Sequence, residues 1–362
     1  MKQCRLCLLP DVVPDSAIDE SGLCQYCRIP AEDRHQAEEN QRLRYLADLE
    51  KTLASVRGQG AYDCLVPVSG GKDSLYLLYR LKEDYGLRVL AFTTDINIPP
   101  VAWRNIRRTL HRLDIPHLSY SPSPHFYRKL FRYLLTHQEA RGAVYTLSYV
   151  YAPLFEGDAI RTAMEKEIPL VLAGYSPGQP EPERMCYEFS RALLCATDWT
   201  PPHLKTCGQF SETELNAFFN PVLLPDSSRI PRYLAPFHAW PYSQEEVIRQ
   251  VTRLGLVKHS HHANPIHSNY PINWLLMYSD LKHFGYNPYH PEFSALIRAG
   301  KANRTYWKLM TPLVNGMIRH QLLLGRHSHH CLKWLGLKES DLCIRLPRGA
   351  YDPVPPATVE EA

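Results

Sequence analysis

Six consecutive residues form the sharpest chemical motif of the sequence: Ser69-Gly70-Gly71-Lys72-Asp73-Ser74. An apolar stretch typical of a strand ends just before them, and a helical pattern begins among them. The two glycines allow a tight turn and a close approach to an anion, while the helix start offers unpaired N–H groups and a positive dipole end. These features predict a phosphate-binding loop. The alternative is an ordinary glycine turn that caps a helix.

Asp73 gives this loop its expected chemistry. A carboxylate beside phosphates is repelled unless a cation lies between them, so Asp73 indicates a bridging Mg²⁺. The loop matches neither the Walker A pattern nor the dinucleotide fingerprint G-x-G-x-x-G, which excludes those two common nucleotide sites. We expect Lys72, Asp73 and Ser74 to be the catalytic residues.

A second motif lies near the amino terminus, where Cys4, Cys7, Cys24 and Cys27 form two C-x-x-C pairs. Sixteen residues separate the pairs, within the roughly 15–20 residues of structural zinc sites. Four thiolates complete a tetrahedral shell with no open position, so we predict structural Zn²⁺. An iron–sulfur cluster or free thiols are the alternatives.

The elements that must position these motifs alternate between strand and helix. Short apolar runs predict strands and amphipathic stretches predict helices, which implies a doubly wound parallel sheet with helices on both faces. The expected strands are 62–68, 88–94, 117–120 and 169–174, and the expected helices are 73–82, 101–113, 126–135, 149–166 and 242–256.

Composition and patterning divide the chain further. The expected parts are a zinc knuckle at 1–30, a helical linker at 31–60, an ATP-binding α/β domain at 61–260, a mostly helical substrate-binding region at 261–346 and a disordered tail at 347–362. Within the α/β domain, the proline- and acid-rich residues 176–228 are expected to form a long loop or insertion.

The overall composition bounds the class of protein. The chain has 362 residues, 44% hydrophobic and 22% charged, which excludes disordered, collagen-like and coiled-coil classes. We find no apolar stretch near the roughly 20 residues of a membrane span and no secretory signal. Ten cysteines then indicate a reducing compartment, so we expect a cytoplasmic protein. The near balance of 41 basic and 37 acidic side chains argues against a nucleic-acid partner.

The loop resembles the signature of the PP-loop ATP pyrophosphatases, Ser-Gly-Gly-x-Asp-Ser after the first strand. The resemblance implies a HUP-like doubly wound sheet that holds ATP. It also implies that AMP is transferred to a carbonyl or amide oxygen, pyrophosphate is released, and ammonia or a sulfur nucleophile displaces AMP. Many relatives carry a histidine where Tyr175 stands. The cofactor-binding residues implied are Ser69, Gly70, Gly71, Lys72, Asp73, Ser74, Thr93, Asp95, Gly174 and Tyr175.

Two further segments resemble the N-acetyl sugar amidotransferases. One is Cys4-Arg5-x-Cys7-x-x-Pro10-Asp11 with the stretch up to Cys24, and the other covers residues 292–304. Members of that family use ATP and ammonia to convert an acetamido group of a sugar into an acetamidino group. The resemblance implies an anionic sugar substrate, which we expect Arg298 and Arg304 to bind, and a separate glutaminase subunit that supplies ammonia.

Two other functions remain open. A PP-loop sulfurtransferase that thiolates tRNA or a small molecule is the main alternative. Residues 100–170 lack the cysteine pair of such iron–sulfur enzymes, although Cys186, Cys195 and Cys207 follow later. A nucleotide-binding sensor with a zinc-mediated contact surface is the third possibility.

Overall fold

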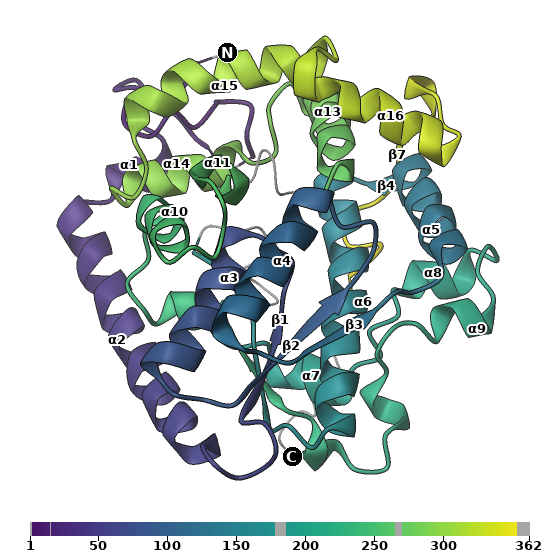
Figure 1. The fold of residues 1–362 in the computed structure, drawn as a ribbon. Helices are drawn as coiled ribbons and strands as arrows, with labels where there is room; N and C mark the ends of the chain where they lie inside the picture. The colour runs from purple at the N-terminus through teal and green to yellow at the C-terminus, as the bar shows by residue number, and fades with distance from the viewer. Residues whose placement is uncertain (1, 15, 178–185, 265–269, 353–362) are drawn as a thin grey trace, which may run out of the picture.

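The computed structural model describes residues 2–14, 16–177, 186–264 and 270–352. A sheet of five parallel strands in the order β3-β2-β1-β5-β6 forms the centre of the molecule (Figure 1). The strands are β1 (Cys64–Pro67), β2 (Val89–Thr94), β3 (His117–Tyr120), β5 (Leu170–Leu172) and β6 (Arg232–Leu234). This confirms the predicted doubly wound α/β class.

Helices surround this sheet and build a separate layer beside it. The described α-helices are α1 (Gln25–Arg28), α2 (Ala31–Val56), α3 (Lys72–Tyr79), α4 (Pro100–Leu113), α5 (Pro124–Thr136), α6 (Ala143–Glu165), α7 (Arg191–Ala196), α8 (Pro202–Thr206), α9 (Glu212–Leu215), α10 (Gln244–Arg253), α11 (Ser260–Ala263), α13 (Ile272–Phe284), α14 (His290–Arg298), α15 (Arg304–Arg319) and α16 (Arg326–Leu335). A π-helical turn, η1 (Arg80–Asp84), and five 3₁₀ turns, η2 (Pro221–Leu223), η3 (Ser227–Arg229), η4 (Pro236–His238), η5 (Leu323–Gly325) and η6 (Glu339–Asp341), complete the set.

Successive side chains of each strand point to opposite faces of the sheet, and along β1, β2 and β5 both faces are buried. Cys64 and Val66 of β1 lie in one core, which α2, α3, α4 and α10 cover. Leu65 lies in the opposite core, which is covered by α6 and by residues around α7. This arrangement explains why the strands have continuous apolar sequences, as parallel strands buried on both faces do.

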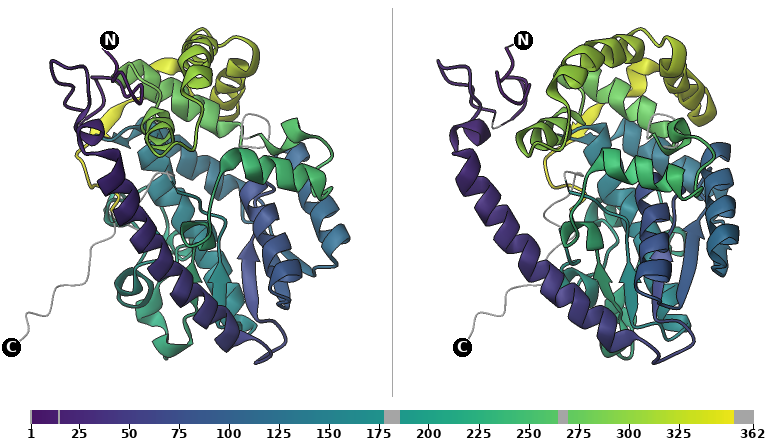
Figure 2. Two further views of the ribbon diagram at one scale, coloured as in Figure 1. Left: turned by 90° about the vertical axis from the view of Figure 1, so that its left-hand side faces the viewer. Right: turned by 60° about the vertical axis from the view of Figure 1, so that its left-hand side comes forward.

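The amino-terminal linker is a single long helix that packs on the α/β layer. Figure 2 shows α2 running along the side of the molecule. Arg42 donates to the carbonyl of Ala239 at 2.9 Å, and Arg232 of β6 pairs with Asp48 at 3.0 Å. The helix is therefore fixed along its length by contacts with the sheet domain.

The proline-rich stretch 176–228 holds more structure than a loop. Where the structure describes it, α7, α8 and α9 are followed by the turns η2 and η3, and β6 comes after them as a fifth parallel strand beside β5. The sequence patterns do not predict β6, and they place the start of α6 at residue 149 rather than at Ala143.

The carboxy-terminal helices form a third core, together with α5 and α6, above the carboxyl ends of the strands (Figure 2). α13 packs against α6, α15 and α16. Asp280 of α13 accepts hydrogen bonds from the backbone N–H groups of Ala143 and Val144. A side chain of the helical region thus caps the first turn of α6, the helix that covers one face of the sheet. Among the described residues, no helix is long and apolar enough to cross a membrane.

The beginning of the tail is ordered, which corrects the expected disorder from residue 347. β7 (Ile344–Leu346) pairs with β4 (Gln138–Glu139). Tyr351 beyond it is fully buried and donates to the carbonyl of His137 at 2.8 Å. Asp352 pairs with Arg141 at 2.6 Å. The remainder of the predicted tail, 353–362, lies outside the described residues.

Candidate nucleotide site and metal centre

The strand order places the predicted loop where ligands bind in sheets of this kind. β2 and β3 lie on one side of β1, and β5 and β6 lie on the other, so the winding reverses between β1 and β5. The carboxyl ends of two strands at such a switch point leave a crevice for a ligand. Residues 69–74 follow β1 and residues 173–176 follow β5, which brings two predicted segments to the same crevice.

Gly70 forms the tight turn of the loop and lies against α4. Its φ is +79°, and a Cβ atom there would lie 2.5 Å from the carbonyl oxygen of Ala102. Asn105 of α4 donates to the carbonyl of Gly70 at 3.1 Å and to that of His262 at 3.0 Å. Only glycine fits this position, and the buried amide holds the loop in place.

Gly174 makes the other close approach of the crevice. A Cβ atom at this position would lie 2.8 Å from the backbone nitrogen of Ser74 and 3.1 Å from the carbonyl carbon of Asp73. The missing side chain therefore lets the end of β5 contact the first turn of α3. Ser74 Oγ donates to the carbonyl of Gly71 at 3.1 Å and lies 3.5 Å from Ser69 Oγ, so both hydroxyls lie within the loop.

Lys72, Asp73 and Tyr242 form a buried polar network at the start of α3. Lys72 Nζ lies 2.6 Å from Asp73 Oδ2 and 3.1 Å from Tyr242 Oη, which in turn donates to Asp73 Oδ1 at 2.9 Å. Burial opposes the charge on Lys72, but the attraction of Asp73 more than offsets it and raises the pKa of Lys72. Burial, together with the charge of Asp73, raises the pKa of Tyr242 to about 12. The site therefore contains a fixed ammonium–carboxylate pair.

A cavity of about 710 Å³ extends from this loop to the helical region. Its volume lies within the roughly 300–1,000 Å³ of small-molecule sites. The loop side is lined by Ser69, Gly71, Lys72, Asp73, Ser74, Gly174, Tyr175 and Ser176, and the helical side includes Asn273, Asn287, Tyr289, Glu292, Phe293, Lys301, Asn303 and Trp307. Two layers of the molecule thus face each other across one space.

The structure places the remaining nucleotide-site candidates differently. Tyr175 lines the cavity and donates to Glu156 at 2.7 Å. Thr93 is buried and donates to the carbonyl of Val68 at 2.9 Å, and Asp95 accepts from the backbone of Ile98 at 3.1 Å. Neither Thr93 nor Asp95 lines the cavity, so both side chains shape the end of β2, whereas their neighbour Thr94 reaches the cavity.

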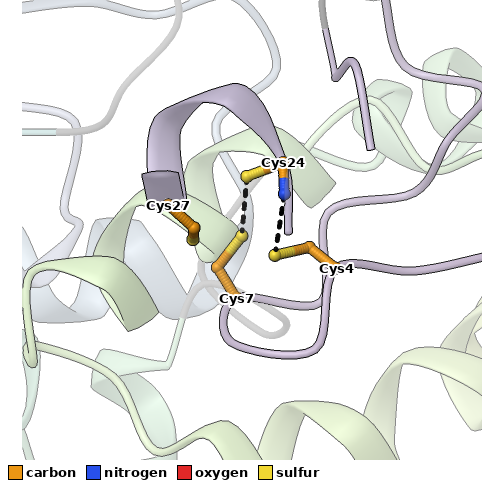
Figure 3. A group of neighbouring side chains, drawn as sticks. All are labelled: Cys4, Cys7, Cys24 and Cys27. Atoms are coloured by element: carbon orange, nitrogen blue, oxygen red, sulfur yellow. Dashed lines mark hydrogen bonds between the residues drawn. The ribbon is translucent and has the colours of Figure 1, made fainter. Parts of the chain in front are cut away.

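The four cysteines of the knuckle converge, with two in the first turn of the chain and two at α1 (Figure 3). Their sulfur atoms lie within 4.8 Å of one another, and all four residues are buried. Burial alone would raise the pKa of Cys4, but hydrogen bonds from backbone N–H groups lower it to about 6. A buried group of four thiols with a stabilised thiolate fits one soft metal ion or a small cluster.

Arg298 and Arg304, which we expected to bind substrate, contact the knuckle. Arg298 donates to Cys7 Sγ at 3.3 Å, and its guanidinium lies 4.8 Å from the ring centre of Tyr26. Arg304 donates to the carbonyls of Leu6 at 3.1 Å and Arg5 at 2.7 Å. Neither arginine lines the cavity. Their contacts join the knuckle to α14 and α15, and this structural role replaces the predicted one.

The other cysteine- and histidine-rich segments form no comparable group. Within the described ranges, the knuckle is the only set of three or more cysteine, histidine or acidic side chains close enough to share a metal ion. Cys186 lies 3.6 Å from His238 Nδ1, whereas Cys207 donates to the carbonyl of Leu204. The thiols that could have served a sulfurtransferase thus contact different parts of the fold.

Tyr242 and Glu292 are site residues that the sequence patterns do not single out. Tyr242 directly precedes Ser243, which caps α10, so the local sequence predicts only the start of a helix. Nothing in it indicates the contact of Tyr242 with Asp73, 169 residues earlier in the chain. Glu292 lies in the segment that resembles the amidotransferases, but nothing in that segment indicates that its carboxyl group enters the cavity.

No protein-family model matches the sequence, and no curated protein matches it. Solved structures that resemble the fold include the U34-tRNA thiolase NcsA from Methanococcus maripaludis with its 4Fe–4S cluster, at 13% identity and a TM-score of 0.35 over 92% of this chain and 89% of that one. NMN synthetase from Francisella tularensis matches at 10% identity and a TM-score of 0.34, over 86% and 97% of the two chains. A predicted subunit of tRNA methyltransferase from Methanocaldococcus jannaschii matches at 16% identity and a TM-score of 0.32, over 63% and 92%. The activity of this chain must therefore be inferred from its own site.

Proposed function

We propose that this chain is an ATP-using, AMP-forming enzyme of the PP-loop type that works in the cytoplasm. One observation carries the proposal: the loop 69–74 lies at the switch point of the sheet, with Gly174 in contact with its helix start and a cavity in front of it. Backbone N–H groups at the start of a helix favour phosphate, and the close approach at Gly174 leaves them unobstructed by a side chain.

The roles of the loop residues follow from their chemistry. Ser69, Ser74 and the loop amides would donate to the pyrophosphate of ATP, and Lys72 would neutralise its charge. The Asp73 carboxylate supplies the oxygen ligands that Mg²⁺ prefers, and the bound ion would offset charge on the leaving pyrophosphate. Tyr242 contacts both Lys72 and Asp73, so it would hold the two charges in position.

We further propose that the group adenylated is the acetamido oxygen of an anionic sugar or nucleotide sugar, and that ammonia then displaces AMP. The two segments that resemble the N-acetyl sugar amidotransferases support this, because Arg298 and Arg304 of one contact the knuckle formed by the other. The cavity wall adds side-chain amides, which hydrogen-bond hydroxyl groups, and the stacked rings of Phe293 and Trp307, 3.7 Å apart. A separate glutaminase subunit would supply the ammonia.

The proposal is tested by incubating the protein with ATP, Mg²⁺, an ammonium salt and a panel of acetamido sugars. We expect acceptor-dependent release of AMP and pyrophosphate, with a sugar product that mass spectrometry identifies as an amidine. Asp73→Asn should abolish release, whereas Asp84→Asn, which removes a carboxylate from the π-helical turn after α3, should not.

Two results would redirect the assignment. Product formation with sulfide in place of ammonium would identify a sulfurtransferase. ATP binding without AMP formation for any acceptor would leave a nucleotide sensor and refute the enzyme.

A further inference from the structure

Glu292 lies on the wall of the cavity opposite the loop. It belongs to the first turn of α14, and its side chain lines the cavity and is partly buried. Lys72 and Asp73 are the charged groups that act on it most strongly. Glu292 is thus a carboxylate of the helical region that faces the charged pair of the loop.

The carboxyl oxygens of Glu292 differ from those of Asp73 in having no fixed partner. Within the part of the chain that the structure describes, no side chain or backbone group forms a hydrogen bond or ion pair with Glu292, while Asp73 is engaged by Lys72 and Tyr242. A carboxylate that lines a ligand cavity and has no hydrogen-bond partner there is free to exchange a proton with whatever occupies that cavity.

The electrostatics of the site agree with this geometry. Burial raises the pKa of Glu292 to about 8, with Lys72 lowering it and Asp73 raising it further. The carboxyl groups of Asp73 and Glu292 therefore differ in their surroundings. Asp73 is held in an ion pair by Lys72, whereas the raised pKa of Glu292 lets it gain or lose a proton near neutral pH. Two carboxyl groups in such contrasting environments typically take different roles in acid–base chemistry.

We propose that Glu292 is the general base of the displacement step, an inference that rests on the proposed ammonia-dependent function. Ammonia attacks the carbon of the adenylated acetamido group and forms a C–N bond. The C–O bond to AMP breaks and its electron pair leaves with AMP. One proton of the attacking nitrogen passes to the Glu292 carboxylate, and the product is an amidinium.

The residues that line the cavity offer few alternatives for this role. Among the described residues, the lining of the cavity includes no histidine, and Lys72 and Tyr242 are already bonded to each other and to Asp73. The remaining acid is Glu245 at the start of α10, whose side chain is exposed to solvent. Glu245 thus provides a matched control, since it borders the same cavity but is exposed to solvent, whereas Glu292 is partly buried.

The experiment separates the two half-reactions in the wild type and in Glu292→Gln, Glu292→Asp and Glu245→Gln. The acceptor is UDP-N-acetylglucosamine, or whichever acetamido sugar supports wild-type turnover. We expect Glu292→Gln to keep acceptor-dependent exchange of pyrophosphate into ATP within about twofold and to lose about 10²- to 10⁴-fold in the rate of amidine formation. Glu292→Asp should regain part of that rate, and Glu245→Gln should match the wild type in both assays.

A change of nucleophile tests proton transfer directly. Hydroxylamine is far less basic than ammonia and loses its proton more readily, so it should restore most of the displacement rate of Glu292→Gln. At a constant concentration of free NH3, the displacement rate of the wild type should also rise with pH through an apparent pKa near 8, and Glu292→Gln should lack this rise.

The outcomes are distinguishable. A wild type that makes no AMP, or adenylates without accepting ammonia, refutes the proposed function. An active wild type alongside a Glu292→Gln variant with undiminished amidine formation overturns the role of Glu292 alone. Equal losses of exchange and amidine formation would also overturn it, because they would indicate a binding contact.

Discussion

Replacing Gly174 by alanine tests the crevice from which the function is inferred. The added Cβ would lie 2.8 Å from the backbone nitrogen of Ser74, and ordinary contact begins at 3.4 Å, so the two backbones must separate by 0.6 Å. The nearest atoms belong to the backbone of the α3 start and cannot rotate away. Overpacking of this kind costs about 1–3 kcal/mol.

The expected effect falls mainly on ATP, because the displaced segment is the one that would hold pyrophosphate. If the whole cost appears in binding, the ATP affinity of Gly174→Ala falls by about 5- to 150-fold. If the strain is already present in the free protein, the free energy of unfolding falls by about 1–3 kcal/mol instead. Isothermal titration with ATP and Mg²⁺ measures the first quantity, and urea unfolding without ligand measures the second.

Gly60→Ala is the matched control, since a Cβ atom there has 3.6 Å of clearance from its nearest neighbour, the carbonyl of Tyr62. It should leave both measurements unchanged. A Gly174→Ala protein with wild-type ATP affinity and wild-type stability would refute the reasoning, because it would mean that β5 and α3 do not form a rigid crevice.

Three further predictions concern the knuckle, the amino-terminal end of the central strand β1 and the polar network. Cys7→Ser should reduce the bound metal from the content of about one site per chain to near zero, measured by elemental analysis, and should lower the melting temperature, measured by calorimetry. Cys343→Ser, which lies outside the group, should change neither quantity. Burial opposes the charge of Asp63, but hydrogen bonds from Arg88 and Gly58 hold its pKa below its usual value. Asp63→Asn should therefore cost about 1–3 kcal/mol in urea unfolding at neutral pH, a difference that shrinks as the pH falls through the folded pKa. Tyr242→Phe should weaken ATP binding by about 2- to 10-fold in titration calorimetry, since Lys72 and Asp73 lose a shared partner.

A strand is easiest to predict from the sequence where its apolar run is continuous. β2 is buried at every position, so its apolar run is unambiguous. β6 has three residues, beginning with Arg232, whose charge is neutralised by Asp48 and Glu188 from distant parts of the chain. No local pattern can indicate a strand that depends on such partners, and for this reason the fifth strand is found only in the structure.

The candidate site likewise has one part that the sequence predicts and another part that it does not. The loop 69–74 is predicted because its glycines, lysine and helix start act on one another locally. The contacts of Arg298 and Arg304 depend on a knuckle almost 300 residues earlier in the chain. The sequence alone does not distinguish an arginine that contacts a substrate from one that contacts a thiol or a backbone carbonyl. Long-range packing determines that difference, and the sequence spacing does not contain it.

The contact between the knuckle and α14 has a consequence for how the protein is made. Cys7 and Arg298 are 291 positions apart, so the knuckle leaves the ribosome long before the helix on which it docks exists. Four closely spaced thiols can load their metal on the nascent chain, but the loaded knuckle must then wait, with Leu9 and Val13 of its core side still uncovered by Ile297. The knuckle can dock only when the carboxy-terminal helices are complete, so premature termination would leave an undocked knuckle.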